Sequence, residues 1–232
     1  PGVSSITLKN LNLMIPHNKV TAIVGVSGIG KTTLMKLLLK FYESQEGTIK
    51  IGDLSLKNIP NDYWRNYCGV VMQEGYIFSN TITRNIIMGG DYIDKGKLYE
   101  SVKLANIQEF IESLPLSYNT IIGAEGIGLS AGQKQRILIA RAIYKNPEYL
   151  FFDEATSALD ANNEKVIMEN LKPFFKNRTV VIIAHRLSTV KDAHQILVLE
   201  DGCIKETGNH KALTAAKGSY YKLVKNQLEL GT

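Results

Sequence analysis

The segment GVSGIGKTT, which runs from Gly25 to Thr33, constrains the fold of this chain more than any other feature. A loop whose consecutive N–H groups converge on phosphate oxygens has no room for side chains at its tight positions, and glycine occupies three of them here. The lysine supplies a positive charge, the threonines supply hydroxyls, and the helix that follows directs its positive end at the same anion. The pattern therefore predicts a phosphate-binding loop.

The residues on either side of this loop provide the setting that it requires. KVTAIVG, which starts at Lys19, has the apolar run of a short buried strand, and TTLMKLLLKF has the composition of an apolar helix. A glycine-rich turn between two elements is the alternative. In the phosphate-binding interpretation, Lys31 contacts the β- and γ-phosphates, Thr32 coordinates Mg²⁺ and Thr33 bonds a phosphate oxygen. The expected nucleotide-binding residues are Gly25, Val26, Ser27, Gly28, Ile29, Gly30, Lys31, Thr32 and Thr33.

Composition narrows the class of protein. A chain of 232 residues that is 44% hydrophobic is long enough to bury a substantial core. The two cysteines, Cys68 and Cys203, are too few for a disulfide framework or a zinc site, which favours a reducing compartment. We find no secretory signal and no apolar run near the ~18 residues that cross a bilayer, so we expect this chain to be soluble by itself. Its net charge of +5 comes from scattered lysines, which favours a solvated surface over a nucleic-acid groove.

The hydrophobic pattern predicts a single α/β domain over residues 1–232. Alternation in the segments that start at Ile6 and Gly47 predicts half-buried antiparallel strands around the phosphate-loop strand, which together form an N-terminal antiparallel β subdomain. Apolar positions then follow helical spacing, which predicts an inserted helical subdomain over residues 83–145. The runs GVVMQ, YLFFD, TVVIIA and QILVLE predict strands of a mainly parallel sheet in the core, residues 1–82 and 146–232. The tail, residues 218–230, has the pattern of an amphipathic helix.

Two acidic residues, Asp153 and Glu154, directly follow the apolar run YLFF. Charge at the end of a buried strand requires a partner. Asp153 is expected beside the phosphate loop, where it holds Mg²⁺ through a water, and Glu154 is expected to polarise the water that attacks the γ-phosphate. The alternative is that DEATS opens a turn or caps a helix.

Small residues also gather before the long helical segment that contains KQRILIARAIY. Ser130 is well placed as its N-cap, and the N–H groups beyond a cap form an anion site. A simpler interpretation is a capped amphipathic helix of the subdomain. In that helix, four polar residues are expected to lie partly on the solvent-facing side, namely Lys134, Gln135, Arg136 and Arg141.

Six segments, which follow one another along the chain in the family's order, make the chain resemble the nucleotide-binding domain of an ABC transporter, over essentially its whole length. GVSGIGKTT resembles the Walker A loop, LSAGQ the signature, FFDE the end of Walker B and SALD the D-loop. Gln73 resembles the Q-loop glutamine, and His185 in IIAHRLS resembles the switch histidine. Without the family, each of these two residues would be assigned a structural role.

The resemblance implies the P-loop ATPase fold of ABC type and a head-to-tail dimer that traps two ATP molecules. The signature residues then act in trans on the nucleotide of the other copy; they are Ser130, Ala131, Gly132 and Gln133. By the same resemblance Gln73 contacts Mg²⁺ and the attacking water, His185 contacts the γ-phosphate, Glu154 is the general base and Asp160 lies across the dimer interface. The implied cofactors are ATP and Mg²⁺, and the implied metal residues are Thr32, Gln73 and Asp153.

Two departures from the family pattern affect binding. Ala131 replaces the first glycine of the common LSGGQ form, so a methyl group stands where backbone approaches phosphate, and the closed dimer is expected to be weaker. The family stacks adenine on an aromatic residue upstream of the loop, and no aromatic precedes Phe41. We expect that residue to lie just before Pro1, and this chain to bind adenine less tightly.

The segment TIIGAEGIG, although Glu125 is displaced by one position, resembles the part of exporters that contacts the membrane domain. VMQEGYIFSNTITRNI and SLPLSYNT resemble bacterial peptide and bacteriocin exporters, some of which carry a peptidase domain. The implied partners are a second copy, as a homodimer, and a transmembrane domain in the same polypeptide, on the cytoplasmic side of a bacterial inner membrane; no nucleic acid is expected. The alternatives are a soluble ABC-type ATPase that acts on nucleic acid or ribosomes, and a nucleotide-binding regulator without turnover.

Overall fold

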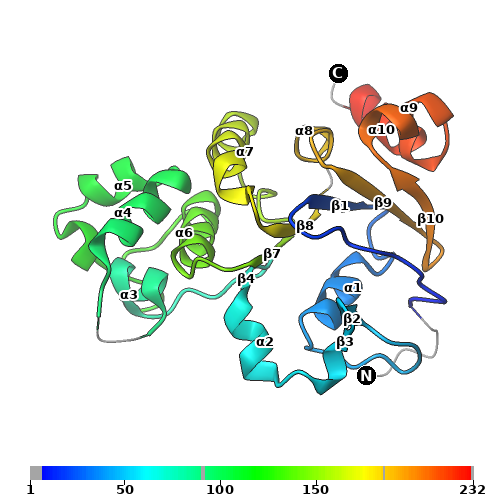
Figure 1. The fold of residues 1–232 in the computed structure, drawn as a ribbon. Coiled ribbons are helices and arrows are strands. Elements are labelled where there is room, and N and C mark those ends of the chain that lie inside the picture. The colour runs from blue at the N-terminus through cyan, green and yellow to red at the C-terminus, as the bar shows by residue number, and fades with distance from the viewer. Residues whose placement is uncertain (1–6, 90–91, 185, 231–232) are drawn as a thin grey trace. The chain divides into compact units, whose positions relative to one another are not determined.

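The computed structural model of the protein describes residues 7–89, 92–184 and 186–230. Contacts divide the chain into two compact units (Figure 1). The first unit consists of Pro1–Cys68 and Asn177–Thr232, and the second consists of Gly69–Lys176. The first unit contains the predicted phosphate loop, and the second contains the acidic pair and the Ser130 turn.

The sheet of the first unit has its strands in the order β10, β9, β1, β8. β1 (Val20–Val24) pairs in parallel with both β8 (Thr179–Ile183) and β9 (Gln195–Glu200). β10 (Cys203–Gly208) is antiparallel to β9. Every residue of β8 and all but the first of β1 are buried, as expected for parallel strands that are covered on both faces. The prediction of a buried phosphate-loop strand in a mainly parallel sheet is confirmed.

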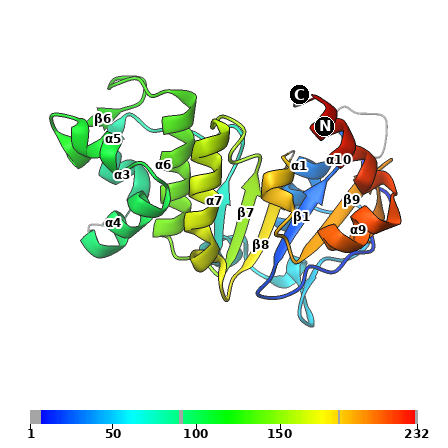
Figure 2. The same ribbon diagram turned by 90° about the horizontal axis from the view of Figure 1, so that it is seen from above.

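Short elements and helices complete the first unit. They are α1 (Lys31–Leu38), β2 (Lys50–Ile51), β3 (Leu54–Ser55), η1 (Leu56–Asn58), α2 (Asn61–Tyr67), α8 (Leu187–Val190), α9 (His210–Ala216) and α10 (Ser219–Leu230). The predicted tail helix is α10, which lies with α9 beside β10 (Figure 1). Figure 2 shows these two helices next to each other. The carboxylate of Glu206 on β10 accepts hydrogen bonds from the N–H groups of Ser219 and Tyr220, at 2.5 and 3.0 Å, and so caps α10.

The antiparallel strands that the sequence predicts near the N-terminus form only in part. β2 and β3 pair as a short antiparallel hairpin, as the segment after Gly47 predicts. Residues 7–18, by contrast, contain no strand, although the alternation from Ile6 predicts one. Asn10 and Asn18 adopt positive φ angles, 46° and 54°, which interrupt extended pairing. A bond from Lys9 N to Gly202 O, 2.8 Å long, ties this segment to the β9–β10 turn instead.

The second unit combines strands with a group of helices. It contains β4 (Cys68–Val71), β5 (Asn80–Thr81), α3 (Ile82–Ile87), α4 (Lys95–Leu104), α5 (Gln108–Ser113), η2 (Ser117–Asn119), β6 (Ile121–Ile122), α6 (Ala131–Tyr144), β7 (Tyr149–Asp153) and α7 (Ala161–Phe175). β7 lies next to β4, and α6 packs against α3 and α4. Val102, Ala105 and Ile111, three of the apolar positions with helical spacing, are fully buried. These helices were expected from that spacing.

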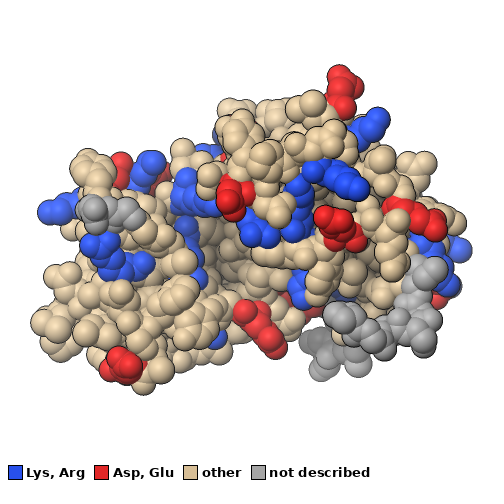
Figure 3. All heavy atoms as spheres, turned by 90° about the horizontal axis from the view of Figure 1, so that it is seen from below, with Lys and Arg blue, Asp and Glu red and all other residues tan. Residues whose placement is uncertain are grey.

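Helix length and surface charge can each be compared with what the composition predicts. Among the described residues, none of the helices combines the length and apolar composition that a bilayer crossing needs. On the face that Figure 3 shows, acidic side chains lie among the basic ones. That face has the mixed, solvated character that the scattered lysines predict.

Candidate functional site

The predicted phosphate loop connects the end of β1 to the start of α1. Gly30, the N-cap of α1, has no side chain to cap the helix, and its φ of 107° is available mainly to glycine. Peptide dipoles give the start of a helix a partial positive charge, and the first N–H groups have no carbonyl partner within the helix. The local geometry is that of an anion-binding helix start.

Neighbouring atoms explain two of the glycines in this loop. A Cβ at Gly25 would lie 2.4 Å from the Leu199 backbone oxygen, and a Cβ at Gly30 would lie 2.8 Å from Leu8 Cδ2. A Cβ at Gly28 would have no neighbour within 4 Å among the described residues, so its requirement is conformational, because its φ is 78°. The glycine spacing in the sequence thus reflects steric contact at both ends of the loop and backbone angle in its middle.

Lys31 places its charge within the curve of this loop. The side chain is only 5% exposed, and Nζ donates to the backbone oxygens of Gly25 and Val26 at 2.8 and 2.9 Å. Buried ammonium groups are tolerated where several oxygens accept hydrogen bonds from them. The lysine charge is therefore held where the loop backbone curves around it, next to the half-buried Thr32 and Thr33.

Asp153 and Glu154 lie in the second unit, where β7 ends. Asp153 is the last residue of the strand and is only 1% exposed. Glu154 is half-buried and has a φ of 49°, which is uncommon for a residue with a side chain and marks a backbone constraint. A turn follows, in which Ser157 N bonds Glu154 O at 3.0 Å. DEATS thus opens a turn, as the alternative interpretation required, and it still leaves two carboxylates at the strand end.

The Ser130 turn in the same unit begins α6, as predicted. Ser130 Oγ accepts from Gln133 N at 3.2 Å and Gln133 Oε1 accepts from Ser130 N at 2.9 Å, which forms a capping box. Ala131, the departure from the family pattern, is exposed at the first position of the helix. A Cβ at Gly132 would lie 3.4 Å from Ala158 O, so this turn packs against the turn that precedes α7.

Asp160 caps α7, because its Oδ1 accepts from Asn163 N at 2.9 Å. Hydrogen bonds from Asn163 hold the pKa of this carboxyl below its usual range. Gln73 is exposed in the irregular segment after β4, and His185 lies outside the described residues. Among the predicted residues, the second unit therefore brings Ser130–Gln133 and the Asp160 turn together, and the first unit holds Gly25–Thr33.

One prediction about α6 is wrong. Gln135 was expected partly on the solvent-facing side, but it is buried. Arg141, expected on the same side, is engaged with the protein: burial lowers its pKa to about 10, and all three nitrogens of its guanidinium donate hydrogen bonds. The reason is that α3 and α4 both pack on α6, so only a narrow strip of α6 faces solvent.

Sequence reasoning missed Asn85 on α3, which accepts two of these three bonds. This residue is 1% exposed, and its side chain bonds the backbone of Phe78, Asn80 and Thr81 as well as Arg141. The only signal in the sequence is one asparagine within the apolar pattern of α3. Together, Asn85 and Arg141 fix the segment that follows Gln73.

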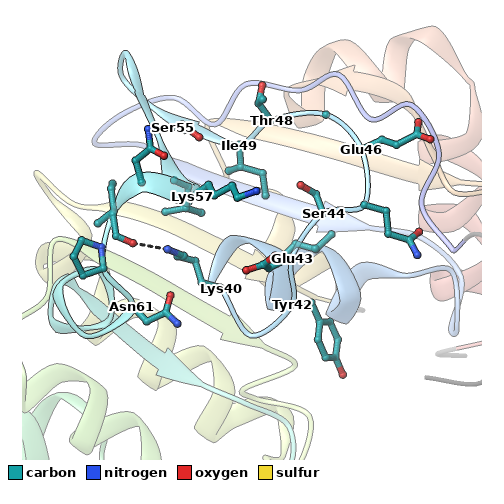
Figure 4. Close-up of a pocket in the computed structure, with 17 residues that line it drawn as sticks. Lys40, Tyr42, Glu43, Ser44, Glu46, Thr48, Ile49, Ser55, Lys57 and Asn61 are labelled. Carbon is teal, nitrogen blue, oxygen red and sulfur yellow. Dashed lines mark hydrogen bonds between the residues drawn. The ribbon is translucent and has the colours of Figure 1, made fainter.

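A cavity of about 610 Å³ lies elsewhere in the first unit (Figure 4). Its lining includes Leu37 and Lys40 at the end of α1, and Lys57 from η1. Lys40 Nζ donates to Ile59 O across one wall. The phosphate loop precedes the opposite end of α1, so this cavity is separate from the predicted nucleotide site.

Comparisons with known proteins agree with this geometry. The family model described as ABC transporter matches residues 8–157, which is more than half of the chain. The alpha-hemolysin translocation ATP-binding protein HlyB of Escherichia coli O157:H7 is 46% identical over 94% of this chain and 31% of its own length. Multidrug resistance protein pgp-1 of Caenorhabditis elegans is 43% identical over 95% of this chain and 17% of its own length. The chain spans less than a third of these curated relatives.

A solved structure supports the same assignment. A bacterial Atm1-family ABC exporter with ATP bound superimposes with a TM-score of 0.92 and 39% identity, over 96% of this chain and 39% of that one. The phosphate loop, the acidic strand end and the capped signature helix thus belong to a P-loop fold of ABC type. Since the family match covers most of the chain and these local geometries agree with it, the chain belongs to the ABC transporter family.

Proposed function

We propose that this chain is the ATP-binding and ATP-hydrolysing domain of an exporter, and that two copies close head to tail around two ATP molecules. The observation that carries the proposal is the loop before α1, where Lys31 Nζ lies among carbonyl oxygens at the positive end of a helix. This arrangement suits a triphosphate, because backbone N–H groups and one ammonium neutralise several phosphate oxygens at once.

The side chains present fit a magnesium complex of the nucleotide. Gly28 has a positive φ, and among the described residues none lies within 4 Å of where its Cβ would be. Thr32 and Asp153 carry oxygen atoms of the hard kind that Mg²⁺ prefers; in this proposal Asp153 would hold the ion through a water, and Gln73 would be a further ligand. When bound, Mg²⁺ would neutralise negative charge on the β- and γ-phosphates.

The proposal also assigns roles in catalysis and in contact with the second copy. Glu154 accepts a proton from the attacking water, Gln73 orients that water, and His185 contacts the γ-phosphate. Ser130–Gln133 of one copy contact the nucleotide of the other, and Asp160 lies across the interface. One chain carries the Walker A residues, the Walker B residues and a signature. Two identical copies can therefore form two equivalent sites, which favours a homodimer.

The exporter assignment rests on relatives named for translocation and multidrug resistance, and on an ATP-bound exporter of the same fold. We propose that membrane helices of the same native polypeptide lie against the region from Gln73 to Arg84 and move when the dimer closes. Peptide cargo is the finer proposal, supported by the likeness to HlyB. The domain would then act at the cytoplasmic side of a bacterial inner membrane.

ATP hydrolysis by the purified chain and by Glu154→Gln tests the catalytic part of the proposal. We expect turnover to fall by about 100-fold or more, since a general base contributes roughly that factor, while Mg-ATP binding remains. The variant should also accumulate as an ATP-stabilised dimer, detected by sedimentation. Equal turnover in the two proteins would remove Glu154 from its assigned role.

Lys31→Ala tests the loop itself. Loss of a charge-assisted contact of about 1.5–3 kcal/mol should weaken Mg-ATP binding by roughly tenfold to 100-fold. A matched control is Lys134→Ala, which removes a half-buried lysine from α6 in the other unit. A Lys31→Ala protein that binds Mg-ATP as tightly as the control would contradict the loop assignment.

A further inference from the structure

Asn106 stands between α4 and α5 in the second unit, and the function proposed above gives it no role. The residue is half-buried and its φ is 53°, in the left-handed region that asparagine tolerates better than most residues. It uses two polar groups at once. Its backbone oxygen accepts from Arg136 Nη1 at 2.8 Å, and its side-chain Nδ2 donates to Asn163 Oδ1 at 3.1 Å.

The first of these bonds leads to the signature turn. Arg136 also donates from Nε to the backbone oxygen of Gly132, at 3.4 Å, so one guanidinium joins Asn106 to the first turn of α6. Burial lowers the pKa of Arg136, and the negative charge of Asp160 opposes that shift. The arginine therefore lies close enough to respond to the charge at the start of α7.

The second bond leads to the turn that Asp160 caps. Asn163 Nδ2 donates to Asp160 Oδ2 at 2.6 Å, and Asn163 N donates to Oδ1 at 2.9 Å. Because the amino end of the Asn163 amide faces a carboxylate, its oxygen end faces Asn106, which must supply a donor. The two turns also lie close together, since a Cβ at Gly132 would be 3.4 Å from Ala158 O.

We propose that Asn106 is a positioning residue that fixes the spacing between the signature turn, Ser130–Gln133, and the Asp160 turn, so that both meet the nucleotide site of a second copy as one rigid piece. The inference rests on the proposed function, because it assumes that a second copy supplies that site. Its chemistry is specific: a donor is needed at the side chain and a left-handed conformation at the backbone.

Asn106→Gly tests this role with little other disturbance. Glycine accepts the same φ and keeps the backbone oxygen that Arg136 bonds, so only the side-chain bridge is lost. Asn106→Asp keeps the size but places a carboxylate oxygen opposite Asn163 Oδ1. The control is Asn177→Gly, the same change at an exposed residue in another left-handed turn, where φ is 59°.

The variants are compared for Mg-ATP binding, for turnover, and for ATP-dependent dimerisation in the Glu154→Gln background. We expect Asn106→Gly to bind Mg-ATP within about twofold of the parent, because the loop of its own copy is unchanged. Turnover should fall and the dimer dissociation constant should rise by about fivefold to tenfold, which corresponds to one net hydrogen bond. Asn106→Asp should reduce turnover and dimer affinity further, and Asn177→Gly should match the parent in both.

Asn163→Ala removes the acceptor and leaves the Asn106 turn intact, so it serves if Asn106→Gly fails to fold. In the double variant with Asn106→Gly, the dimer dissociation constant should rise by less than the product of the two single fold-changes, because both substitutions remove the same side-chain bridge. Turnover and dimerisation equal to the Asn177→Gly control, in either single variant, would overturn the inference. Absence of ATP-dependent dimers in the parent Glu154→Gln protein would instead overturn the proposed function.

Discussion

Arg141 on α6 donates its Nε to the backbone oxygen of Asn85 on α3 at 2.7 Å, and its Nη2 to the side-chain oxygen of the same residue at 3.2 Å. Its Nη1 bonds Tyr76 O at 2.9 Å, and the guanidinium carbon lies 5.6 Å from the centre of the Phe78 ring. One side chain thus connects the signature helix to the segment after Gln73, which displays the exposed Tyr76 and Phe78. That segment has little regular structure of its own, so its shape depends on this contact.

Arg141→Ala should lower the free energy of unfolding by about 2–4 kcal/mol, because it leaves partly buried carbonyl groups without their donors. Arg141→Lys should recover only part of this loss, since an ammonium cannot reproduce the planar fork of the guanidinium. Urea denaturation followed by circular dichroism measures both. Lys134→Ala, on the same helix, serves as the control. A lysine variant as stable as the parent would show that the fork geometry does not matter.

Alanine substitutions of the loop glycines should lower the free energy of unfolding most where the new methyl group meets a close neighbour. Gly25→Ala brings a methyl against Leu199 O and should cost about 2–4 kcal/mol of unfolding free energy. Gly28→Ala has open space and a φ of 78°, so only the conformational cost of about 1–2 kcal/mol applies. Gly47→Ala, at a φ of 76° and also in open space, is its matched control. The reverse order of stability between the first two variants would refute the contact seen at Leu199.

Ala131→Gly restores the glycine of the common signature. Because Ala131 is exposed at the first position of α6, removal of its methyl lets the backbone approach an anion more closely. We expect ATP-dependent dimers of the Glu154→Gln protein to become severalfold tighter, while the free energy of unfolding falls by no more than about 1 kcal/mol. Sedimentation at several protein concentrations gives the dissociation constant. A weaker dimer would mean that the methyl makes a favourable contact.

Tyr118 predicts a loss of stability at high pH. Its hydroxyl is buried without a hydrogen-bond partner among the described residues, and burial raises its pKa from 10.0 to about 12, with smaller contributions from Glu112 and Tyr99. The folded state therefore keeps this proton between pH 10 and pH 12 while the unfolded state loses it, so the free energy of unfolding must fall as pH rises through that window.

Tyr118→Phe should show a smaller fall than the parent between pH 9 and pH 11, as measured by urea denaturation at each pH. Tyr92→Phe, at a side chain that is 83% exposed, provides the matched control. Identical pH dependence in the parent and in Tyr118→Phe would show that this phenol does not resist ionisation.

The features predicted correctly from the sequence are those that depend on neighbouring residues. The run before Gly25 is apolar and short, as a covered parallel strand must be, and the structure places β1 there. The cap at Ser130 also follows from neighbouring residues alone, because a hydroxyl three residues before a glutamine satisfies two helix-end donors. The phosphate loop and the helix start could therefore be placed without any knowledge of distant contacts.

Contacts between residues far apart in sequence could not be predicted this way. Asn85 and Arg141 are 56 residues apart, and only the packing of α3 on α6 makes them partners. Gln135 is also buried, although its charged neighbours in the sequence suggested a solvent-facing position. The missing strand near Lys9 has a different cause, since alternation predicts pairing but two asparagines with positive φ turn the backbone away from it. His185 stays a prediction, outside the described residues.

The capping box at Ser130 determines which hydrogen-bonding groups of the signature turn remain for a ligand. With Gln133 Oε1 committed to Ser130 N, the two hydrogens on Nε2 of the same amide are the groups left to donate to a ligand. Such an end attracts oxyanions and repels cations before any partner arrives. Under the proposed function, a second copy that docks here would bring its phosphates to donors that the capping box has already oriented.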